Sequence, residues 1–348
     1  MAATEARDAM LYEPADEGSV HCKLCGHRCT IAAGKYGRCS VRENVAGALK
    51  THSYGRLIAM NADPIEKKPL FHFLPGSMSM SVAAPGCNFQ CPFCQNWQIS
   101  QAPRDGRELR GRAVSPERIV DAAESYNCAS ISYTYTEPTV FFEMAYETAR
   151  IAHRRGLGNC FVSNGYLTPE AVETIAPYLD AINVDLKAFR DGTYRDIMKA
   201  RLEPVLTCLR ALVAAGIWVE VTTLVVPGMN DSEAELRDIA QFIADELGPA
   251  VPWHVSRFHG DYDMTAVPPT PLSALEAACR LGRKAGLKYV YCGNVHGRAD
   301  ESTHCPNCAE TVLDRRGFLM RDNRLADGAC PDCGEPIEGV WSLAHASR

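Results

Sequence analysis

The sequence predicts an α/β protein whose main part is a partial or complete barrel, preceded by a cysteine-rich segment and followed by a zinc-ribbon-like tail. Short apolar runs alternate with helical patterns from about residue 77 to residue 295, as in consecutive βαβ units. The chain has 348 residues, of which 46% are hydrophobic and 22% charged, so it can bury a large core. We expect domains at 1–75, 76–298 and 299–348.

Charge and hydropathy exclude several classes of partner. The net charge of −6 argues against binding to nucleic acid or anionic membranes through overall charge. No apolar run approaches the roughly 20 residues of a membrane span. The first 18 residues, MAATEARDAMLYEPADEG, lack the apolar region of a secretory signal. We therefore expect a cytoplasmic protein that binds neither nucleic acid nor membrane.

Sixteen cysteines are the most informative part of the composition. Eleven form three groups with short gaps, which suit thiolates that converge on metal centres in a reducing compartment better than they suit disulfides. The remaining five fall in predicted strands and helices and are expected to be small buried hydrophobic residues; they are Cys128, Cys160, Cys208, Cys279 and Cys292.

The barrel is expected to begin with a strand at 77–85 and to contain about seven strands. The other strands are predicted at 129–135, 159–164, 180–186, 218–228, 252–258 and 289–295. Helical patterns lie between them, at 140–156, 169–179, 193–216, 231–248 and 272–286. Helix starts are indicated by Ser115-Pro116, Thr168-Pro169 and Asp231-Ser232, because Ser, Thr and Asp accept from free amides and Pro suits the first turn.

The loop after the first barrel strand carries Cys87, Cys91 and Cys94 with three- and two-residue gaps. Three thiolates on one loop can hold three corners of a [4Fe–4S] cluster, which normally takes four protein ligands. No fourth cysteine is near in sequence, so one iron would stay open for chemistry. The alternative is a structural zinc site with a distant fourth ligand, but such sites are closed and usually use paired Cys-x2-Cys motifs.

Polar residues follow three further strands, where the mouth of a barrel carries its chemistry. Glu137 ends YTYTEP, Ser163 and Asn164 follow the next strand, and Asp185 and Lys187 follow the one after. Each also has a structural interpretation. Glu137 could cap the following helix, the Ser-Asn-Gly tripeptide could be an ordinary turn, and Asp185 could be a helix-start acid.

His254 lies in PWHVSRF on the sixth predicted strand, where it shares a face with Ser256. A lone histidine on an apolar strand is more often a hydrogen-bonded core residue than a ligand. Asn294 and His296 follow the last strand and form a further polar pair at the expected mouth.

The tail contains two Cys-x2-Cys motifs separated by 21 residues, which is the pattern of a zinc ribbon. The four cysteines are Cys305, Cys308, Cys330 and Cys333. A mononuclear iron site has the same ligands and stays open as an alternative. The tail mixes acids with bases and is not a basic patch, so we expect a structural or docking role.

The N-terminal group consists of Cys22, Cys25, Cys29 and Cys39. It could bind Zn²⁺ or an auxiliary [4Fe–4S] cluster. Any of His21, His27 and His52 could replace one ligand. Spacing alone slightly favours zinc, because a compact Gly-rich turn follows the first three cysteines instead of a second cysteine motif.

The run GCNFQCPFCQNW, with an aromatic residue between its second and third cysteines, resembles the radical S-adenosylmethionine (SAM) enzymes. Within them the chain is similar to the branch of the pyruvate formate-lyase activating enzyme, and more so to the radical SAM member of the AmmeMemoRadiSam system. The resemblance covers nearly the whole barrel. It rests on KKPL before the cysteines and on YTYTEP, SNGY, NVDLKAF, LVVPGMND and WHVSRF after them.

This resemblance implies that the amino and carboxylate groups of SAM chelate the open iron. An electron from the cluster then cleaves the sulfonium C–S bond and releases methionine and a 5′-deoxyadenosyl radical, which abstracts hydrogen from a substrate. The resemblance also implies a flavodoxin or ferredoxin as electron donor, and Memo-like and AMMECR-like proteins as candidate partners. An auxiliary cluster at the N-terminal cysteines would relay electrons.

The resemblance also assigns roles to the strand-end residues. Glu137 would accept from the SAM ammonium, although Tyr135 and Thr136 replace the glycines of the usual Gly-Gly-Glu. It places Ser163 or Asn164 near the SAM ribose or carboxylate.

For the later strands, the resemblance directs Asp185 to the ribose and Lys187 to the carboxylate. It places His254 near the adenine or ribose, with His259 as an equal candidate.

Two other functions compete with this one. A glycyl-radical enzyme activase would need a partner protein that bears the glycine. A non-catalytic zinc-binding adaptor would use the central cysteines as a third structural site. The GxSxG, HExxH and Walker motifs of hydrolases and NTPases are absent from the sequence.

Overall fold

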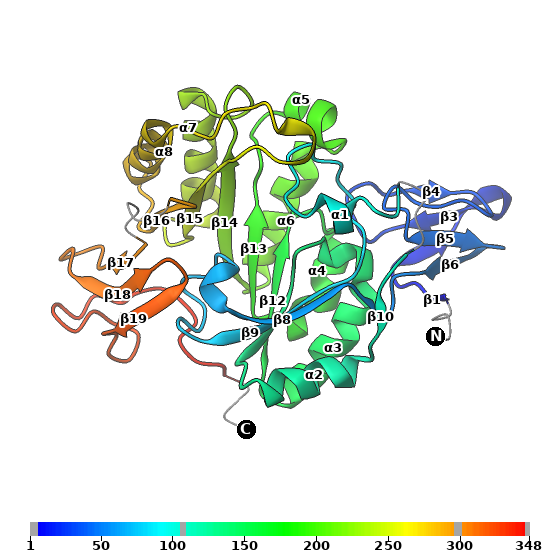
Figure 1. Ribbon diagram of the computed structural model, residues 1–348, viewed down its shortest axis with the longest axis horizontal. Coiled ribbons are helices and arrows are strands. Elements are labelled where there is room, and N and C mark those ends of the chain that lie inside the picture. Colours follow the sequence, from blue (N-terminus) through cyan, green and yellow to red (C-terminus); the bar gives the residue numbers. More distant parts are fainter. Residues whose placement is uncertain (1–5, 105–108, 296–300, 345–348) are drawn as a thin grey trace.

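The computed structural model describes residues 6–104, 109–295 and 301–344. Its centre is an eight-stranded sheet with the order β16-β15-β14-β13-β12-β11-β9-β8 (Figure 1). Neighbouring strands from β9 to β16 are parallel, and β8 runs antiparallel to β9. In the part of the chain that is described, β8 and β16 lie at the two edges of this sheet, so the barrel is partial.

The strands of the sheet are short, as expected for βα units. Their bounds are β8 (Ala59–Pro64), β9 (Met78–Ala83), β11 (Ser130–Tyr133), β12 (Gly158–Ser163), β13 (Ala181–Asp185), β14 (Trp218–Val225), β15 (Trp253–Arg257) and β16 (Val290–Gly293). Every residue of β11 is buried, which is typical of parallel strands covered on both faces.

Helices connect the parallel strands and cover the sheet. The α-helices are α1 (Trp97–Ser100), α2 (Pro116–Ser125), α3 (Phe142–Arg154), α4 (Pro169–Ile175), α5 (Asp191–Thr193), α6 (Leu202–Ala214), α7 (Glu233–Phe242) and α8 (Leu272–Lys284). The predicted caps are confirmed, because the side chains of Ser115, Thr168 and Ser232 each accept from a backbone amide of the first turn.

The predicted α/β fold is confirmed, and the seven expected strands are β9 and β11 to β16. β8 is an addition, because the sheet begins at Ala59, within the segment assigned to the N-terminal domain. The sequence AMNADP gives little sign of this strand, since Asn, Asp and Pro are all depleted in strands.

The N-terminal segment forms two small three-stranded sheets, β1-β6-β5 and β2-β3-β4, at one end of the molecule (Figure 1). The strands are β1 (Arg7–Asp8), β2 (Tyr12–Pro14), β3 (Val20–Cys22), β4 (Thr30–Ile31), β5 (Arg42–Val45) and β6 (Ala48–Thr51). A separate two-stranded pair joins β7 (Arg56–Leu57) to β10 (Arg112–Ala113).

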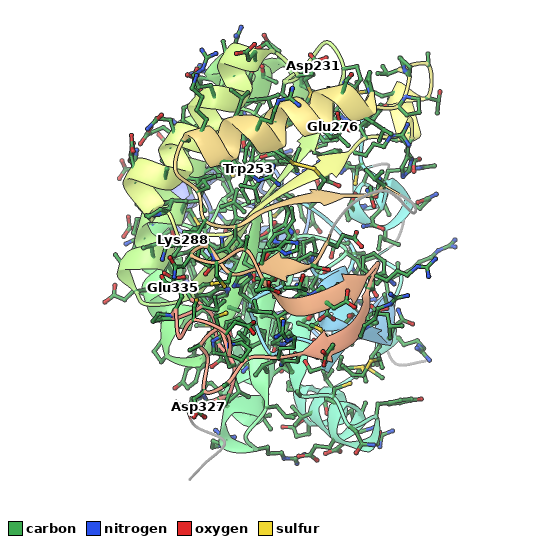
Figure 2. The ribbon with its side chains drawn as sticks, turned by 90° about the vertical axis from the view of Figure 1, so that its left-hand side faces the viewer. Asp231, Trp253, Glu276, Lys288, Asp327 and Glu335 are labelled. Carbon is green, nitrogen blue, oxygen red and sulfur yellow. A yellow bond between two sulfur atoms is a disulfide. The ribbon has the colours of Figure 1, made fainter. Side chains whose placement is uncertain are left out.

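The tail forms the sheet β17 (Thr303–His304), β18 (Thr311–Arg316) and β19 (Leu319–Asn323) at the opposite end of the molecule (Figure 1). In Figure 2, which faces this end, α8 with Glu276 lies above the strands of the tail. Arg315 anchors the tail, because its guanidinium donates to the Phe71 carbonyl at 2.6 Å and lies over the Phe71 ring. The tail therefore shares packing with the barrel.

Two of the five scattered cysteines differ from the prediction. Cys279 on α8 and Cys292 on β16 form a disulfide. The helix packs against the strand that follows it, which brings together thiols that the sequence shows only as separate apolar positions. Cys128, Cys160 and Cys208 are buried free thiols, as expected. Among the described residues, none of the helices combines the length and apolarity needed to cross a bilayer.

Candidate metal and cofactor site

Cys87, Cys91 and Cys94 lie on the loop between β9 and α1, at the carboxyl-terminal edge of the parallel sheet. We call residues 84–96 the cluster loop and these three residues the cluster-loop cysteines. Cys91 is buried, and Cys87 and Cys94 are half-buried. The loop thus presents three thiols at the edge where α/β barrels carry their chemistry.

Arg104 fixes the shape of the cluster loop. Its guanidinium donates to the carbonyl oxygens of Cys87 at 2.6 Å, Phe89 at 3.0 Å and Arg38 at 2.9 Å. It also donates to Gln101 Oε1 at 2.7 Å. The role of Arg104 could not be predicted from the sequence, because the segment after the loop shows no periodic pattern and the contacts span up to 66 residues.

The surroundings of the sulfurs fit a bound iron–sulfur cluster. Cys87 Sγ accepts from the Phe89 amide at 3.4 Å and from Asn164 Nδ2 at 3.8 Å. Burial raises the pKa of Cys91 to about 12, while the Lys187 ammonium opposes this rise. Thiols buried in this way ionise only when a donor or a cation compensates the charge. Metal ions at the loop would neutralise the thiolate charge, and the Phe89 amide and Asn164 Nδ2 could still donate to Cys87 Sγ.

Glu137 is buried and accepts four hydrogen bonds from the protein. Its carboxylate accepts from the Thr139 amide at 3.2 Å and hydroxyl at 3.1 Å, from the Ser163 hydroxyl at 2.9 Å and from the Asn164 amide at 2.9 Å. It caps the 3-10 turn Pro138–Phe141. Burial raises its pKa although the four donors favour the carboxylate. Glu137 therefore has the capping role and also connects the ends of two strands.

Asn164 has an acceptor that nothing in the described protein satisfies. Its Nδ2 donates to Asn88 Oδ1 at 2.7 Å, while its own Oδ1 is buried without a hydrogen-bond partner. An unpaired buried acceptor costs free energy of folding. Such an atom at a strand end therefore indicates that a bound ligand supplies the missing hydrogen-bond donor. Ser163 Oγ donates to Glu137 and accepts from the Gly165 amide at 3.1 Å. Ser163 thus supports the turn, and the Asn164 oxygen is the free group.

Gly165 must be glycine for this turn to form. Its φ is +69°, and an added Cβ would lie 2.6 Å from Val184 Cγ1.

Asp185 and Lys187 form a second polar group at the same edge. Lys187 Nζ donates to Asp185 Oδ2 at 2.9 Å, and its backbone amide donates to the hydroxyl of buried Tyr194 at 3.1 Å. Burial disfavours the ammonium, but the Asp185 carboxylate and the Cys91 thiolate together raise the pKa of Lys187. Lys187 therefore stays protonated beside the cluster loop.

His254 lies in a different network from these residues, contrary to its predicted role at the SAM site. Its Nε2 bonds to Glu220 Oε2 at 2.6 Å, and its ring stacks on Tyr291. Glu220 also accepts from the amides of Phe71 and His72. The histidine is thus a hydrogen-bonded core residue, which the apolar strand around it favoured.

His259, the other candidate, contacts the cluster loop through Gln95, at 2.9 Å between the two side-chain nitrogens. The segment after β15 continues this contact, because the Asp263 amide donates to the Pro92 carbonyl at 2.9 Å. Asn294 is exposed and donates to the Arg257 carbonyl. His296 lies outside the described residues.

The four cysteines of the tail converge closely enough for one metal ion. Their sulfurs all lie within 4.8 Å of one another, with Cys305 and Cys333 at 3.6 Å and Cys308 and Cys330 at 3.6 Å. Four sulfurs at 2.3 Å from one zinc would be about 3.8 Å apart. The set is compatible with metal binding.

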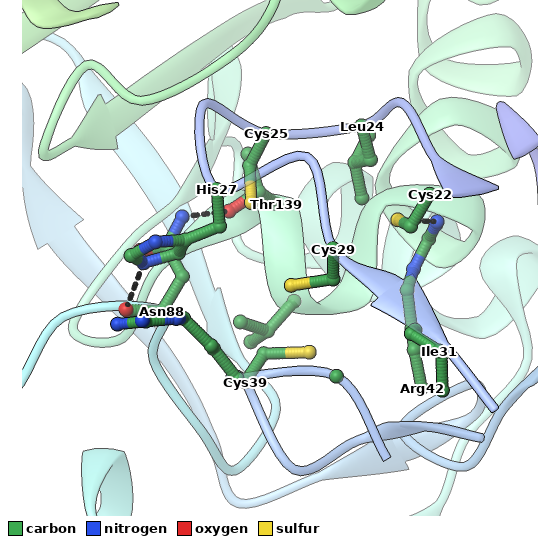
Figure 3. A pocket seen from close by; sticks show the side chains of 13 residues that line it. Cys22, Leu24, Cys25, His27, Cys29, Ile31, Cys39, Arg42, Asn88 and Thr139 are labelled. Carbon is green, nitrogen blue, oxygen red and sulfur yellow. Dashed lines mark hydrogen bonds between the residues drawn. The ribbon is translucent and has the colours of Figure 1, made fainter. Parts of the chain in front are cut away.

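The N-terminal cysteines come together beside the cluster loop. Cys22, Cys25, Cys29 and Cys39 line one cavity with Asn88 of that loop (Figure 3). The segment contacts the barrel mouth through amides, because Gly26 N donates to the Tyr166 carbonyl at 2.8 Å and Thr168 N to the Leu24 carbonyl at 3.2 Å.

Comparisons with known proteins agree with this geometry. The model of the radical SAM superfamily matches residues 81–243, which include the cluster-loop cysteines. The chain is 46% identical to the uncharacterized protein MJ0808 of Methanocaldococcus jannaschii, over 96% of this chain and 99% of the relative.

More distant relatives are activating enzymes. The benzylsuccinate synthase activating enzyme of Thauera aromatica is 24% identical over 56% of this chain and 65% of the relative. The isethionate sulfite-lyase activating enzyme of Nitratidesulfovibrio vulgaris is 32% identical over 47% of this chain and 57% of the relative. The chain therefore spans less than two thirds of these two relatives.

Among solved structures, a radical SAM methyltransferase from Sphaerobacter thermophilus has the same fold, with a TM-score of 0.50 and 16% identity. The match covers 63% of this chain and 67% of the other. Radical SAM proteins are enzymes, and membership of their family implies a [4Fe–4S] cluster and SAM. The chain belongs to the radical SAM superfamily.

Proposed function

We propose that this protein cleaves SAM reductively at a [4Fe–4S] cluster held by Cys87, Cys91 and Cys94, and abstracts hydrogen from a substrate at the mouth of the barrel. The observation that carries the proposal is the unpaired Oδ1 of buried Asn164, whose Nδ2 lies 3.8 Å from Cys87 Sγ. When bound, the reduced cluster supplies the electron that breaks the C–S bond of SAM.

The residues around the loop have separate tasks in this proposal. Asn164 Oδ1 accepts from the SAM ammonium, and Glu137 holds the Asn164 backbone in place. Lys187, kept ionised by Asp185, attracts the SAM carboxylate, while the second oxygen of Asp185 remains available for a ribose hydroxyl. Arg104 keeps the cluster loop in its binding shape.

A second candidate is the activation of a glycyl-radical enzyme. It is favoured by two relatives, whose names identify them as activating enzymes. An electron donor of the flavodoxin or ferredoxin type would serve either function. Memo-like and AMMECR-like proteins are the partners to test first.

The experiment reconstitutes the enzyme anaerobically with iron and sulfide and adds SAM and a reductant, with and without each candidate partner protein. We expect 5′-deoxyadenosine to form and to increase when the substrate is present. A mass change in the partner identifies a product, and a stable radical on its backbone identifies an activase. Zinc as the only metal in the protein would instead support the adaptor function.

The tail is proposed to bind one Zn²⁺ through Cys305, Cys308, Cys330 and Cys333, since four close thiolates form a closed tetrahedral site. Its role is structural, because a tail of this size gains folding free energy from the metal.

A further inference from the structure

The cavity beside the cluster loop is lined by four thiols and by apolar side chains that include Leu24 and Ile31 (Figure 3). We propose that it holds a second [4Fe–4S] cluster, bound by Cys22, Cys25, Cys29 and Cys39. This cluster exchanges one electron with the cluster held by the cluster-loop cysteines. The relay role rests on the proposed function, whereas the cluster itself does not.

The separation of the sulfurs favours a cluster over a single ion. Zinc bound by four thiolates brings them to about 3.8 Å from one another, and the tail cysteines show this spacing. Among the residues that the structure describes, only the tail forms such a close group of ligand atoms. The N-terminal thiols instead line one cavity without forming such a group, and the cluster-loop cysteines likewise form no close group. The geometry thus favours a [4Fe–4S] cluster at these cysteines, whereas the spacing in the sequence slightly favoured zinc.

The proposed ligand set is the four cysteines, which all line the cavity, whereas His21 and His52 do not line it. The three histidines that could replace a ligand each have another partner. His27 Nε2 donates to the Asn88 carbonyl at 2.8 Å, His21 Nδ1 bonds to Thr30 Oγ1 at 3.3 Å, and His52 Nε2 bonds to Glu43 Oε2 at 2.7 Å. Four thiolates complete the coordination of all four irons, so this cluster would have no open iron.

The charges around the cavity suit a bound anionic cluster. Arg42 is buried, forms an ion pair with Glu143, and donates to Cys22 Sγ at 3.5 Å. Four thiolates can share this space only when metal ions neutralise their charge.

Two direct connections join the cavity to the cluster loop. Asn88 lines the cavity, accepts from His27, and is the neighbour of Cys87. Arg104 donates to the carbonyls of both Arg38, which lines the cavity, and Cys87. Hydrogen-bonded backbone of this kind keeps the two sites at a fixed separation.

The relay step is a balanced one-electron exchange. An external one-electron donor of the flavodoxin or ferredoxin type reduces the N-terminal cluster from the 2+ to the 1+ state. That cluster returns to 2+ as the cluster on the cluster loop goes from 2+ to 1+.

The test uses the full chain with all three cluster-loop cysteines changed to alanine, reconstituted anaerobically with iron and sulfide. We expect about four irons per chain and, after reduction, an electron paramagnetic resonance signal of a [4Fe–4S]⁺ cluster. Adding Cys25→Ala should abolish both, whereas adding Cys128→Ala, at a buried cysteine away from the metal sites, should preserve both.

The proposal is overturned if the triple variant contains two zincs and no iron, or no metal beyond that of the tail. This count leaves the N-terminal segment intact, so a folding defect of Cys25→Ala cannot obscure it. Wild-type protein that fails to cleave SAM while the triple variant keeps its cluster would refute the proposed function and leave the second cluster standing. The relay is tested with Cys25→Ala in a chain that keeps the cluster-loop cysteines. Reduction of the cluster on the cluster loop by the donor protein should be slower than in wild type, whereas its reduction by dithionite should be unchanged. Equal slowing with both reductants, or no slowing with the donor protein, would contradict the relay.

Discussion

Replacing Glu137 with glutamine tests whether this buried carboxylate positions the SAM site. Among the described residues, Oε1 accepts from three donors, namely the Thr139 amide, the Thr139 hydroxyl and the Ser163 hydroxyl, while Oε2 accepts only from the Asn164 amide. The amide of Glu137→Gln should therefore keep its oxygen toward the three donors and turn its NH2 toward the Asn164 N–H.

The variant loses one hydrogen bond to a charged group, which is worth roughly 1.5–3 kcal/mol. Since about 1.4 kcal/mol corresponds to tenfold in binding, displacement of Asn164 should weaken SAM binding about ten- to a hundredfold. Iron loading should not change, because among the described residues Glu137 makes no direct hydrogen bond to the cluster-loop cysteines and Cys87 Sγ keeps the Phe89 amide as a donor when Asn164 moves.

The assay is a SAM titration of the reduced protein followed by electron paramagnetic resonance, in which ligation of the open iron changes the signal. Glu117→Gln is the matched control, because it makes the same chemical change at an exposed glutamate in the first turn of α2. A titration of Glu137→Gln that matches wild type, with full iron content, would refute the positioning role and leave only the cap.

Three further results are expected. Asp185→Asn should weaken SAM binding more mildly than Glu137→Gln in the same titration, because the Lys187 ammonium remains; a stronger effect would assign Asp185 the larger role. Cys305→Ser should lose one equivalent of zinc and make the tail sensitive to protease; full metal content and unchanged proteolysis would contradict the tail site. Burial lowers the pKa of His72 to about 4 from an ordinary 6.5, so the unfolded chain binds the proton more readily. Stability should therefore fall by about 3 kcal/mol as the pH falls from about 6.5 to about 4, and His72→Gln should flatten this part of a urea-unfolding profile; an equal slope in both proteins would contradict it.

Local patterns in the sequence predicted most of the fold and part of the site. The parallel strands appear as short apolar runs because both of their faces are buried, and the spacing of the cluster-loop cysteines is carried by eight consecutive residues. β8 was not predicted, because several of its residues, AMNADP, are rare in strands.

Contacts between distant segments could not be predicted in this way. Ser163 and Asn164 donate to Glu137 from 26 and 27 residues away. Sequence patterns therefore could not show that these residues occupy its carboxylate. The same holds for the hydrogen bonds from Arg104 to the cluster loop and for the disulfide between Cys279 and Cys292. For His254, the family resemblance implied a contact with the cofactor, but in the structure its imidazole bonds to Glu220.

The most direct test of radical SAM chemistry is the yield of 5′-deoxyadenosine from anaerobically reconstituted protein with SAM and dithionite, compared between wild type and Cys91→Ala. Both proteins should retain the metal of the tail, which checks that the substitution leaves the tail folded. We predict that wild type forms 5′-deoxyadenosine and that Cys91→Ala forms none. Equal yields from the two proteins, or no product from wild type with its cluster fully loaded, would contradict the assignment of the cluster-loop cysteines to SAM cleavage.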